Sequence, residues 1–324
     1  EDKIVAAPLS PSTRFETQLV NLGRIDNEGI EIDLGIDLIN REDFSWNLKN
    51  IFNATESLVV ETVDDAIIQL AIPGATSAVG PNSPVFADRF AVPGKPLGVI
   101  MGNYALRDDE GNLLLDGVNG SNAQAFEVLT SDDPRLPDAV IGDPNPDWTL
   151  TTINSFRYKN FTFSAQLEFT HGGDLLSQTV VELLERGVTR DTENREGSFV
   201  IPGVIGDPET GLPLFDLNGN SIPNNIQFNG LRTVFSNYYN ADDLGVFDAS
   251  VFRIREISLG YSLDGEKLKL PFETMNFTLT GRNLWFKAPN FPKYVNYDPE
   301  SDGGLGRNNV PSTKRFALGI SLTL

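Results

Sequence analysis

Few residues in this chain have the type and spacing to do chemistry. His171 is the only histidine among the 324 residues, so a histidine triad or a histidine-ligated metal centre has at most one such member. Cysteine is absent, which excludes disulfides, cysteine-ligated zinc and a thiol nucleophile. Asp298 and Glu300 could pair their carboxylates for acid-base work. We expect no catalysis there, no metal and no cofactor, and we expect His171 at the end of a strand.

The run from Asp216 to Asn220 carries oxygen-bearing side chains at alternate positions, as a calcium loop does. The twelfth position of such a loop is Gln227 instead of the glutamate of an EF-hand. The run is therefore interpreted as a turn rich in Asn and Gly.

The net charge limits the classes of partner that the protein is expected to bind. Lys and Arg number 25 against 45 Asp and Glu, a net charge of −20. Nucleic acid binds basic surfaces, so we expect no nucleic-acid partner. No run of eighteen or more apolar residues occurs, which excludes a transmembrane helix.

The elements that must position these residues are strands. Apolar and polar residues alternate over 275–280 and over 316–324, the period of two that gives a strand one apolar and one polar face. In the strand over 252–263 the apolar set changes from even to odd positions at Glu256, which predicts a β-bulge there. Arg253 and Arg255 are expected on one face of that strand, in salt bridges rather than in ligand capture.

Further strands alternate in the same way, and we expect strands to begin near 28, 44, 148, 161, 251, 274 and 314. Residues 1–27 are predicted to be mostly irregular, with at most a short strand over 15–19. Residues 62–147 are predicted to be a long irregular connection, 187–250 a long polar connection, and 175–186 a short helix. The runs 107–110 and 131–133 are expected to be solvated loops.

The connections alternate between short turns, after 39, 159 and 263, and long loops, after about 56, 171 and 285. Because neighbours in an antiparallel sheet reverse direction, all short turns fall at one end, as in outer-membrane barrels. Strands of ten or eleven residues suffice to cross a bilayer when tilted. Aromatic residues near the strand ends fit interfacial girdles, although aromatics are also good strand formers. The sequence predicts an all-β portion of an antiparallel transmembrane β-barrel, with about seven or more strands, short periplasmic turns and long extracellular loops.

Several motifs in this order resemble the C-terminal part of the SusC/RagA family of TonB-dependent outer-membrane transporters. They are Asn27–Glu31, Gly142–Trp148, Gly172-Gly173-Asp174, the strand over 252–261, Gly281–Trp285, Tyr297–Glu300 and the closing strand from Arg315. The residues that carry the resemblance as family-motif positions are Gly172, Gly173, Asp174, Arg253, Gly260, Tyr261, Asn283, Leu284, Asp298, Pro299 and Glu300. The family usually ends on an aromatic residue, whereas this chain ends on Leu324.

The resemblance implies an active importer of oligosaccharides or peptides in the outer membrane of a Gram-negative bacterium. It also implies contact with outer-membrane lipid, a SusD-like surface lipoprotein as lid, and TonB acting on a plug. Seven strands cannot close such a barrel, and an open edge cannot face lipid. We therefore expect residues 1–324 to be the C-terminal part of a larger transporter, with the plug domain and N-terminal strands absent.

Two readings from other classes remain open. A secreted soluble glycan-binding β-sandwich would also explain the alternation and the acidity, although the long loops disfavour it. A glycoside hydrolase would explain the abundant carboxylates, although no acid pair stands out by its spacing.

Overall fold

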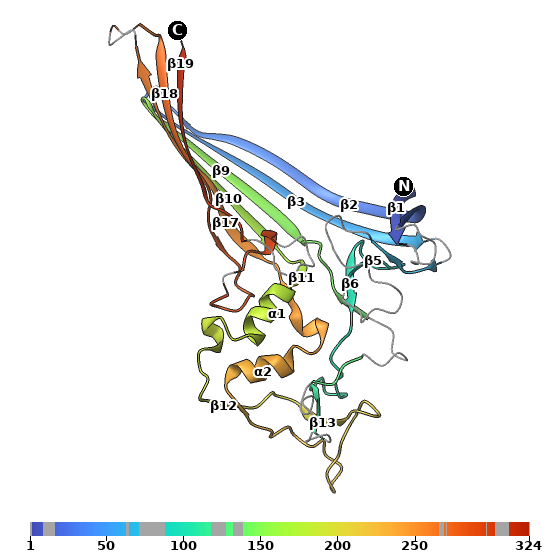
Figure 1. Ribbon diagram of the computed structural model, residues 1–324. Helices are drawn as coiled ribbons and strands as arrows, with labels where there is room; N and C mark the ends of the chain where they lie inside the picture. The colour runs from blue at the N-terminus through green and yellow to red at the C-terminus, as the bar shows by residue number, and fades with distance from the viewer. Residues whose placement is uncertain are drawn as a thin grey trace.

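The computed structural model describes residues 2–8, 17–62, 65–70, 88–117, 128–131, 139–265, 269, 271–295, 297–301 and 311–323. Within these residues, one sheet of eight antiparallel strands dominates the molecule (Figure 1). In spatial order the strands are β1 (Asp2–Pro8), β2 (Thr17–Asn40), β3 (Phe44–Thr62), β9 (Trp148–Tyr158), β10 (Phe161–His171), β17 (Val251–Asp264), β18 (Thr274–Lys287) and β19 (Arg315–Thr323). Strands that are consecutive in this sheet are also joined along the chain, which is the order of a barrel wall.

The strands predicted after Asn27 from the alternation of apolar and polar residues are confirmed. The prediction of an irregular segment over 1–27 is wrong for its described part. Asp2–Pro8 forms β1, and β2 begins at Thr17. This part of β2 pairs with β1 on one side and, from Gly23 onwards, with β3 on the other. Pairing with both neighbours satisfies the backbone groups of this segment whatever its side chains are. The segment can therefore be a strand without an alternating sequence pattern that would predict one.

The connections lie where the alternation of turns and loops predicts. Short turns join β2 to β3, β9 to β10 and β17 to β18 at one end of the sheet, and β19 runs back to that end with the C-terminus (Figure 1). The long connections gather at the opposite end (Figure 1). The β2–β3 and β9–β10 hairpins have the predicted positions.

The register gives the sheet one apolar and one polar face. Ile30, Ile32, Leu34, Ile36 and Leu38 share a face of β2, and the same face continues through alternate residues of each neighbouring strand to Phe316, Leu318, Ile320 and Leu322 of β19. These side chains are not covered, since Leu34 is 48% and Leu318 72% exposed. The opposite face carries mostly Glu, Asp, Asn, Gln, Ser and Thr, together with basic residues such as Lys49 and Arg253.

Aromatic rings form two rows on the apolar face. Near the short turns the contacts are Trp46 with Phe156 (centroids 5.4 Å apart), Phe156 with Phe163 (6.0 Å) and Phe161 with Tyr261 (4.7 Å). Near the loops they are Phe52 with Trp148 (6.2 Å), Trp148 with His171 (5.3 Å), Phe169 with Phe252 (4.6 Å) and Phe252 with Trp285 (5.7 Å). Between the two rows the face is mostly aliphatic, with Asn50, Thr152 and Asn154 as polar exceptions on β3 and β9.

The long connections fold into a layer of short elements at the loop end (Figure 1). The first contributes β4 (Ile68–Gln69), β5 (Asp88–Ala91), β6 (Val99–Gly102), β7 (Leu114–Asp116) and β8 (Ala139–Gly142). The second contributes β11 (Asp174–Leu176), α1 (Gln178–Glu185), η3 (Arg190–Thr192), β12 (Ser198–Phe199), β13 (Val204–Asp207), β14 (Leu212–Pro213), β15 (Phe228–Asn229), α2 (Leu231–Tyr238), η4 (Asp242–Gly245) and β16 (Val246–Asp248). The third contributes η5 (Pro299–Ser301).

The prediction that 62–147 is irregular is therefore wrong for its described parts, and the polar stretch over 187–250 also forms short strands and helices. Leu113, Leu115 and Val128 of the first connection pack with Ile201 and Ala241 of the second in one buried cluster. These contacts join segments far apart in sequence, so no local periodicity signals them. Most of the large fully buried side chains lie in this loop layer, while the sheet exposes its apolar face.

The predicted helix over 175–186 is present but shorter. It begins after Ser177, whose hydroxyl oxygen accepts a hydrogen bond from the backbone N–H of Val180, while Leu175 and Leu176 belong to β11. The second helix, α2, was not predicted, and none of its residues is fully buried. No helix in the described parts of the chain is both long and apolar enough to cross a membrane.

Candidate functional site

A β-bulge in β17 organises the polar face near the loops. The pairing of β17 with both neighbours skips Arg255, which lies between the paired residues Ile254 and Glu256. The bulge is thus confirmed one residue before the predicted Glu256. On β18 the bulge places Asn283 at φ +51°, in the left-handed region that asparagine tolerates better than most residues.

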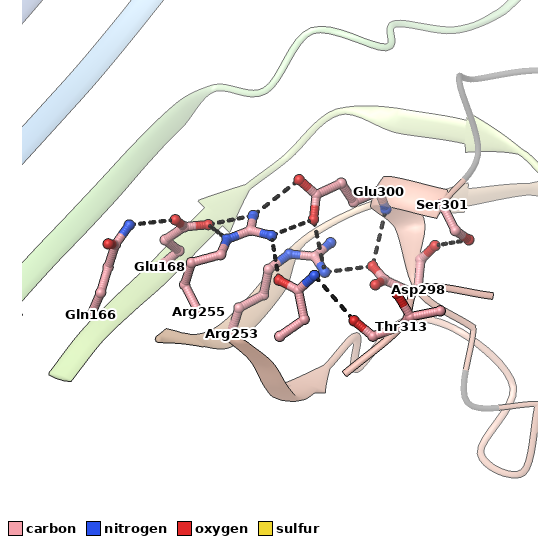
Figure 2. Close-up of polar contacts among 9 residues, drawn as sticks. Gln166, Glu168, Arg253, Arg255, Asp298, Glu300, Ser301 and Thr313 are labelled. Atoms are coloured by element: carbon pink, nitrogen blue, oxygen red, sulfur yellow. Dashed lines mark hydrogen bonds and ion pairs between the residues drawn. The ribbon is translucent and has the colours of Figure 1, made fainter. Parts of the chain in front are cut away.

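The bulged Arg255 is the centre of a charged cluster (Figure 2). Its guanidinium donates to Glu168 on β10 at 2.7 Å, to both carboxylate oxygens of Glu300 at 2.8 and 3.0 Å, and to the side-chain oxygen of Asn283 at 3.0 Å. Each guanidinium nitrogen therefore has at least one partner. The expected salt-bridge role is what the contacts show, and the cluster leaves Arg255 little capacity to capture a ligand.

Arg253 extends the cluster into the protein. Its side chain is 9% exposed and pairs with Asp298, itself 5% exposed, at 2.5 Å, with Glu300 3.4 Å away (Figure 2). The carboxylate of Asp298 also accepts the backbone N–H of Glu300 at 3.1 Å, which shapes the short helical turn at Pro299. Three motifs distant in sequence, on β17, β18 and the Tyr297–Glu300 run, thus meet at one place.

The sequence analysis missed Glu168 and Gln166 as members of this cluster. Gln166 donates to Glu168 at 2.9 Å, and both lie on the polar face of β10. The alternation of β10 could have indicated that they share a face with Arg253, but not the register that brings them to it. Arg282 and Glu256 form a further pair nearby, at 2.6 Å.

The Gly-Gly-Asp motif lies in a second cluster at the loop end of the sheet. Gly172 and Gly173 have φ of +74° and +78°, and a Cβ on Gly172 would lie 2.4 Å from a carboxylate oxygen of Asp147. Asp174 donates its backbone N–H to the carbonyl of Asp143 at 2.6 Å and accepts the N–H of Asp143 on its carboxylate at 2.9 Å. Reciprocal hydrogen bonds therefore join the motifs at 142–148 and 172–174.

Burial raises the pKa of Asp174, and the nearby carboxylates of Asp143, Asp248 and Asp147 raise it further, while the backbone N–H of Asp143 acts in the opposite direction. His171, as expected, ends its strand, with its ring 5.3 Å from that of Trp148 and its Nε2 3.8 Å from the carboxylate of Asp147.

The remaining motif residues lie outside both clusters. Gly260 sits opposite Thr162, whose hydroxyl oxygen would lie 2.3 Å from an added Cβ, and the ring of Tyr261 contacts Phe161. Leu284 packs over Gly281 on the same strand. Gly260 and Tyr261 thus serve packing between strands near the short turns, whereas the contact of Leu284 lies within β18.

The Asp216 run forms the expected turn. The carboxylate of Asp216 accepts the backbone N–H groups of Asn218 and Asn220 at 2.8 and 2.9 Å, and these bonds hold its pKa below the ordinary value. Within the described residues, no three His, Asp or Glu side chains are grouped so that they could hold a metal ion. The run 107–110 also turns back on itself, with Asp108 accepting the N–H groups of Glu110 and Asn112, whereas most of 131–133 lies outside the described residues.

A hollow of about 540 Å³ lies where β2 and β3 meet the 143–147 segment. Its charged lining is entirely acidic: Asp26, Glu28, Glu56, Asp143 and Asp147. In the cluster around Arg255 no acid pair is free, because Glu168, Asp298 and Glu300 are all engaged by arginine. The Arg253–Asp298 and Asp143–Asp174 contacts hold loops to the sheet, and the polar face of the sheet offers hydrogen-bonding groups.

Two TonB-dependent receptors are similar in sequence to this chain. The TonB-dependent receptor P3 of Formosa agariphila is 24% identical over 99% of the chain and 31% of its own length. The TonB-dependent receptor SusC of Bacteroides thetaiotaomicron is 23% identical over 99% of the chain and 29% of its own length. The chain is a relative of the SusC-type TonB-dependent receptors. No family model matches it.

The structure agrees with this relationship. The RagAB peptide importer in its 'closed-closed' state matches with a TM-score of 0.59 at 17% identity, over 99% of the chain and 32% of the matched one. In the 'open-open' state the TM-score is 0.56 at 16% identity. The likeness shows the fold: the sheet is an antiparallel portion of a TonB-dependent receptor barrel, as the alternation predicts. The chain spans about a third of the length of these relatives, which are receptors and importers rather than enzymes.

Proposed function

We propose that this chain forms barrel wall and extracellular loops of an active importer in the outer membrane of a Gram-negative bacterium. The cargo is an oligosaccharide or a peptide, the lid is a SusD-like surface lipoprotein, and the energy comes through TonB. The observation that carries the proposal is the two-faced sheet, whose uncovered apolar face lies between two rows of aromatic rings. Hydrocarbon between two interfacial girdles is the environment that such a face fits.

The polar face is the lumen wall on this proposal. Lys49 and Asp33 pair across β2 and β3 at 2.9 Å, and Asn47 and Asn53 donate to Asp37 and Glu31. Such hydroxyl, amide and carboxylate groups offer hydrogen bonds to a hydrated peptide or sugar. A secreted β-sandwich would need its apolar face covered by a second sheet, so the exposure of Leu34 and Leu318 disfavours that alternative.

The loop layer is the surface for the lid and part of the cargo cavity. The first and second connections are tied by reciprocal bonds: Asp242 accepts the N–H of Asn103 at 3.2 Å and donates its own N–H to Asn103 at 2.6 Å. Asp243 accepts the N–H of Ala105 at 2.9 Å. Because the connections form one packed unit, movement of a lid attached to one is transmitted to the other.

We further propose that residues 1–324 are the C-terminal part of a longer transporter whose plug and N-terminal strands lie in the remainder. The lengths of the relatives support this, since each is about three times as long as the part it shares with this chain. The intact mass of the native polypeptide, extracted from outer membrane with detergent, tests it: about three times 35.5 kDa is expected, and a mass near 35.5 kDa would contradict it.

The function is tested on the full-length transporter by replacing residues 206–222, a protruding hairpin on which Leu217 is fully exposed, with a short Gly-Ser linker. We expect loss of at least tenfold in co-purified surface lipoprotein or in uptake of labelled oligosaccharide or peptide. The matched control replaces Arg41–Asp43, in a short turn at the opposite end, and should retain both. Full lid binding and uptake after deletion of either long connection would contradict the proposal.

A further inference from the structure

The three carboxylates of the cluster around Arg255 are not equally buried. The side chain of Asp298 is 5% exposed and pairs with Arg253. That of Glu168 is 21% exposed and pairs with Arg255 at 2.6 Å. Glu300 exposes 52% of its side chain, although both arginines share it. Without Glu300, each arginine therefore still has one carboxylate partner of its own.

The carboxylate of Glu300 occupies a position that two guanidinium groups form (Figure 2). Its Oε2 and Oε1 atoms lie 2.8 and 3.0 Å from the two terminal nitrogens of Arg255, in the side-by-side pairing with which arginine recognises carboxylates. Oε2 also lies 3.4 Å from Arg253. Both arginines belong to β17 of the wall, whereas Glu300 reaches this position from the third long connection. We call the position between Arg253 and Arg255 the paired-arginine site.

The ion pairs of Glu300 can be exchanged for those of another carboxylate. Water screens the ion pairs of exposed side chains, so such pairs contribute little to stability. With Glu300 in place the paired-arginine site is full, but a carboxylate that displaces Glu300 meets the same two guanidinium groups. The site lies on the polar face of the sheet, beside Gln166 and Glu168 of β10. On the proposed function this face lines the lumen through which the cargo passes.

We propose that the paired-arginine site binds a carboxylate of the imported cargo, and that Glu300 fills the site as an internal stand-in when cargo is absent. A peptide carries such a group at its C-terminus and an acidic oligosaccharide carries it on its uronate rings, whereas a neutral oligosaccharide has none. Displacement frees Glu300 from the wall, while Asp298 still ties the same short helical turn to Arg253. The inference rests on the proposed function, because it requires the polar face to line the path of the cargo.

Glu300→Gln in the full-length transporter tests the proposal, because it removes the competing charge and so raises the apparent affinity for an external carboxylate. The purified protein in detergent is titrated with tri-alanine and with tri-alanine amide, and saturation-transfer NMR follows the binding. We expect Glu300→Gln to bind tri-alanine at least tenfold more tightly than the native protein, with no gain for the amide. Glu256→Gln is the matched control, since it removes a carboxylate paired with Arg282 on the same face and leaves Glu300 in place.

A second pair of probes, digalacturonate and the neutral digalactose, separates the two sources of carboxylate. A gain with tri-alanine alone assigns the site to peptide termini, and a gain with digalacturonate alone assigns it to acidic sugars. Arg255→Lys added to Glu300→Gln keeps the positive charge but not the paired geometry, and should abolish the gain.

The inference would be overturned if neither acid bound Glu300→Gln more tightly than the native protein, undetectable binding included. An equal gain for the uncharged probes or for Glu256→Gln would overturn it as well. These results leave the proposed function standing, which fails instead if the native full-length protein is absent from the outer membrane.

Discussion

At the scale of single residues, the family-motif residues Arg253, Asp298 and Glu300 are held by contacts with one another. Arg253 and Asp298 form a buried ion pair, and a buried charge left without its partner is costly. Glu300 is half-exposed and shared between Arg253 and Arg255, so its ion pairs are partly screened by water. The ion pairs of Asp298 and Glu300 therefore contribute different amounts of stability, although only a proline separates the two residues.

Replacing Asp298 by Asn should destabilise the loop end by about 3 kcal/mol, since Arg253 then remains buried with only the longer contact to Glu300. Glu300→Gln, the matched control, should cost about 1 kcal/mol or less. Hydrogen exchange at 297–301 and the guanidinium unfolding midpoint measure both. Equal effects of the two substitutions would refute the ranking.

The pKa of Asp174 is raised in the folded protein by burial and by neighbouring carboxylates. The stability it contributes is therefore present below its unfolded pKa of about 3.9 and is lost as the pH rises through the folded value. We expect Asp174→Asn, whose side-chain oxygen can still accept the N–H of Asp143, to gain thermal stability over the native chain as the pH rises from 4 to 7.

Asp216→Asn provides the control of opposite sign, because backbone N–H groups lower the pKa of Asp216. The stability from Asp216 is present above its unfolded pKa and lost on acidification. Melting temperatures of both variants and the native chain at pH 4, 5.5 and 7 decide the matter, and parallel curves for Asp174→Asn and the native chain would contradict the first expectation.

At the scale of elements, the bulge shared by β17 and β18 turns a wall strand into an anchor for a loop. The extra residue directs Arg255 to Glu168 of the preceding strand and Glu300 of the following loop at once. Asn283 permits the geometry by adopting a positive φ and accepting from Arg255. Arg253 and Arg255, two residues apart, would share a face in a regular strand as well, so what the bulge changes is that Arg255 is left out of the pairing with both neighbouring strands.

Asn283 should therefore respond to substitution according to backbone conformation. Asn283→Val should cost about 1–2 kcal/mol for the left-handed backbone and about 1 kcal/mol for the lost hydrogen bond. Asn283→Gly should lose only the bond, and Asn283→Asp should be tolerated. Unfolding midpoints in detergent rank the three, and a valine variant as stable as the glycine variant would show that the bulge can relax.

At the scale of the whole molecule, the sheet and the loop layer differ in where their apolar side chains lie. The sheet has little buried core of its own and exposes its apolar face, while the loop layer buries Leu115, Val128, Val180 and Leu184. Stability of the wall thus depends on its surroundings, whereas the loop layer packs like a small soluble domain. The arrangement suits a protein whose wall is solvated by lipid and whose loops stand in water.

This division predicts an orientation. A cysteine at Asn218, on the tip of the protruding hairpin, should react with a membrane-impermeant maleimide on intact cells. A cysteine at Glu42, in the turn between β2 and β3, should react only after the outer membrane is permeabilised. Both positions are exposed turns, so they form a matched pair. Labelling of Glu42→Cys on intact cells would reverse the proposed topology.

The sequence by itself determined seven of the eight strands described in the wall, the hairpins, the end of the sheet at which the short turns lie, and the bulge to within one residue. Period-two alternation and turn residues are local signals, and a strand whose two faces meet different surroundings must carry them. The resemblance to SusC-type receptors was visible for the same reason, since its motifs are short runs.

Only the tertiary structure decided the rest. The N-terminal half of β2 is a strand because β1 and β3 pair with it, and the connections are ordered because segments such as 113–115 and 201–204 bury each other. The meeting of Arg253, Arg255 and Glu168 depends on strand register, and that of Asp298 and Glu300 on a loop folding back over the wall. Such contacts are made by residues distant in sequence, whose pairing no local pattern encodes.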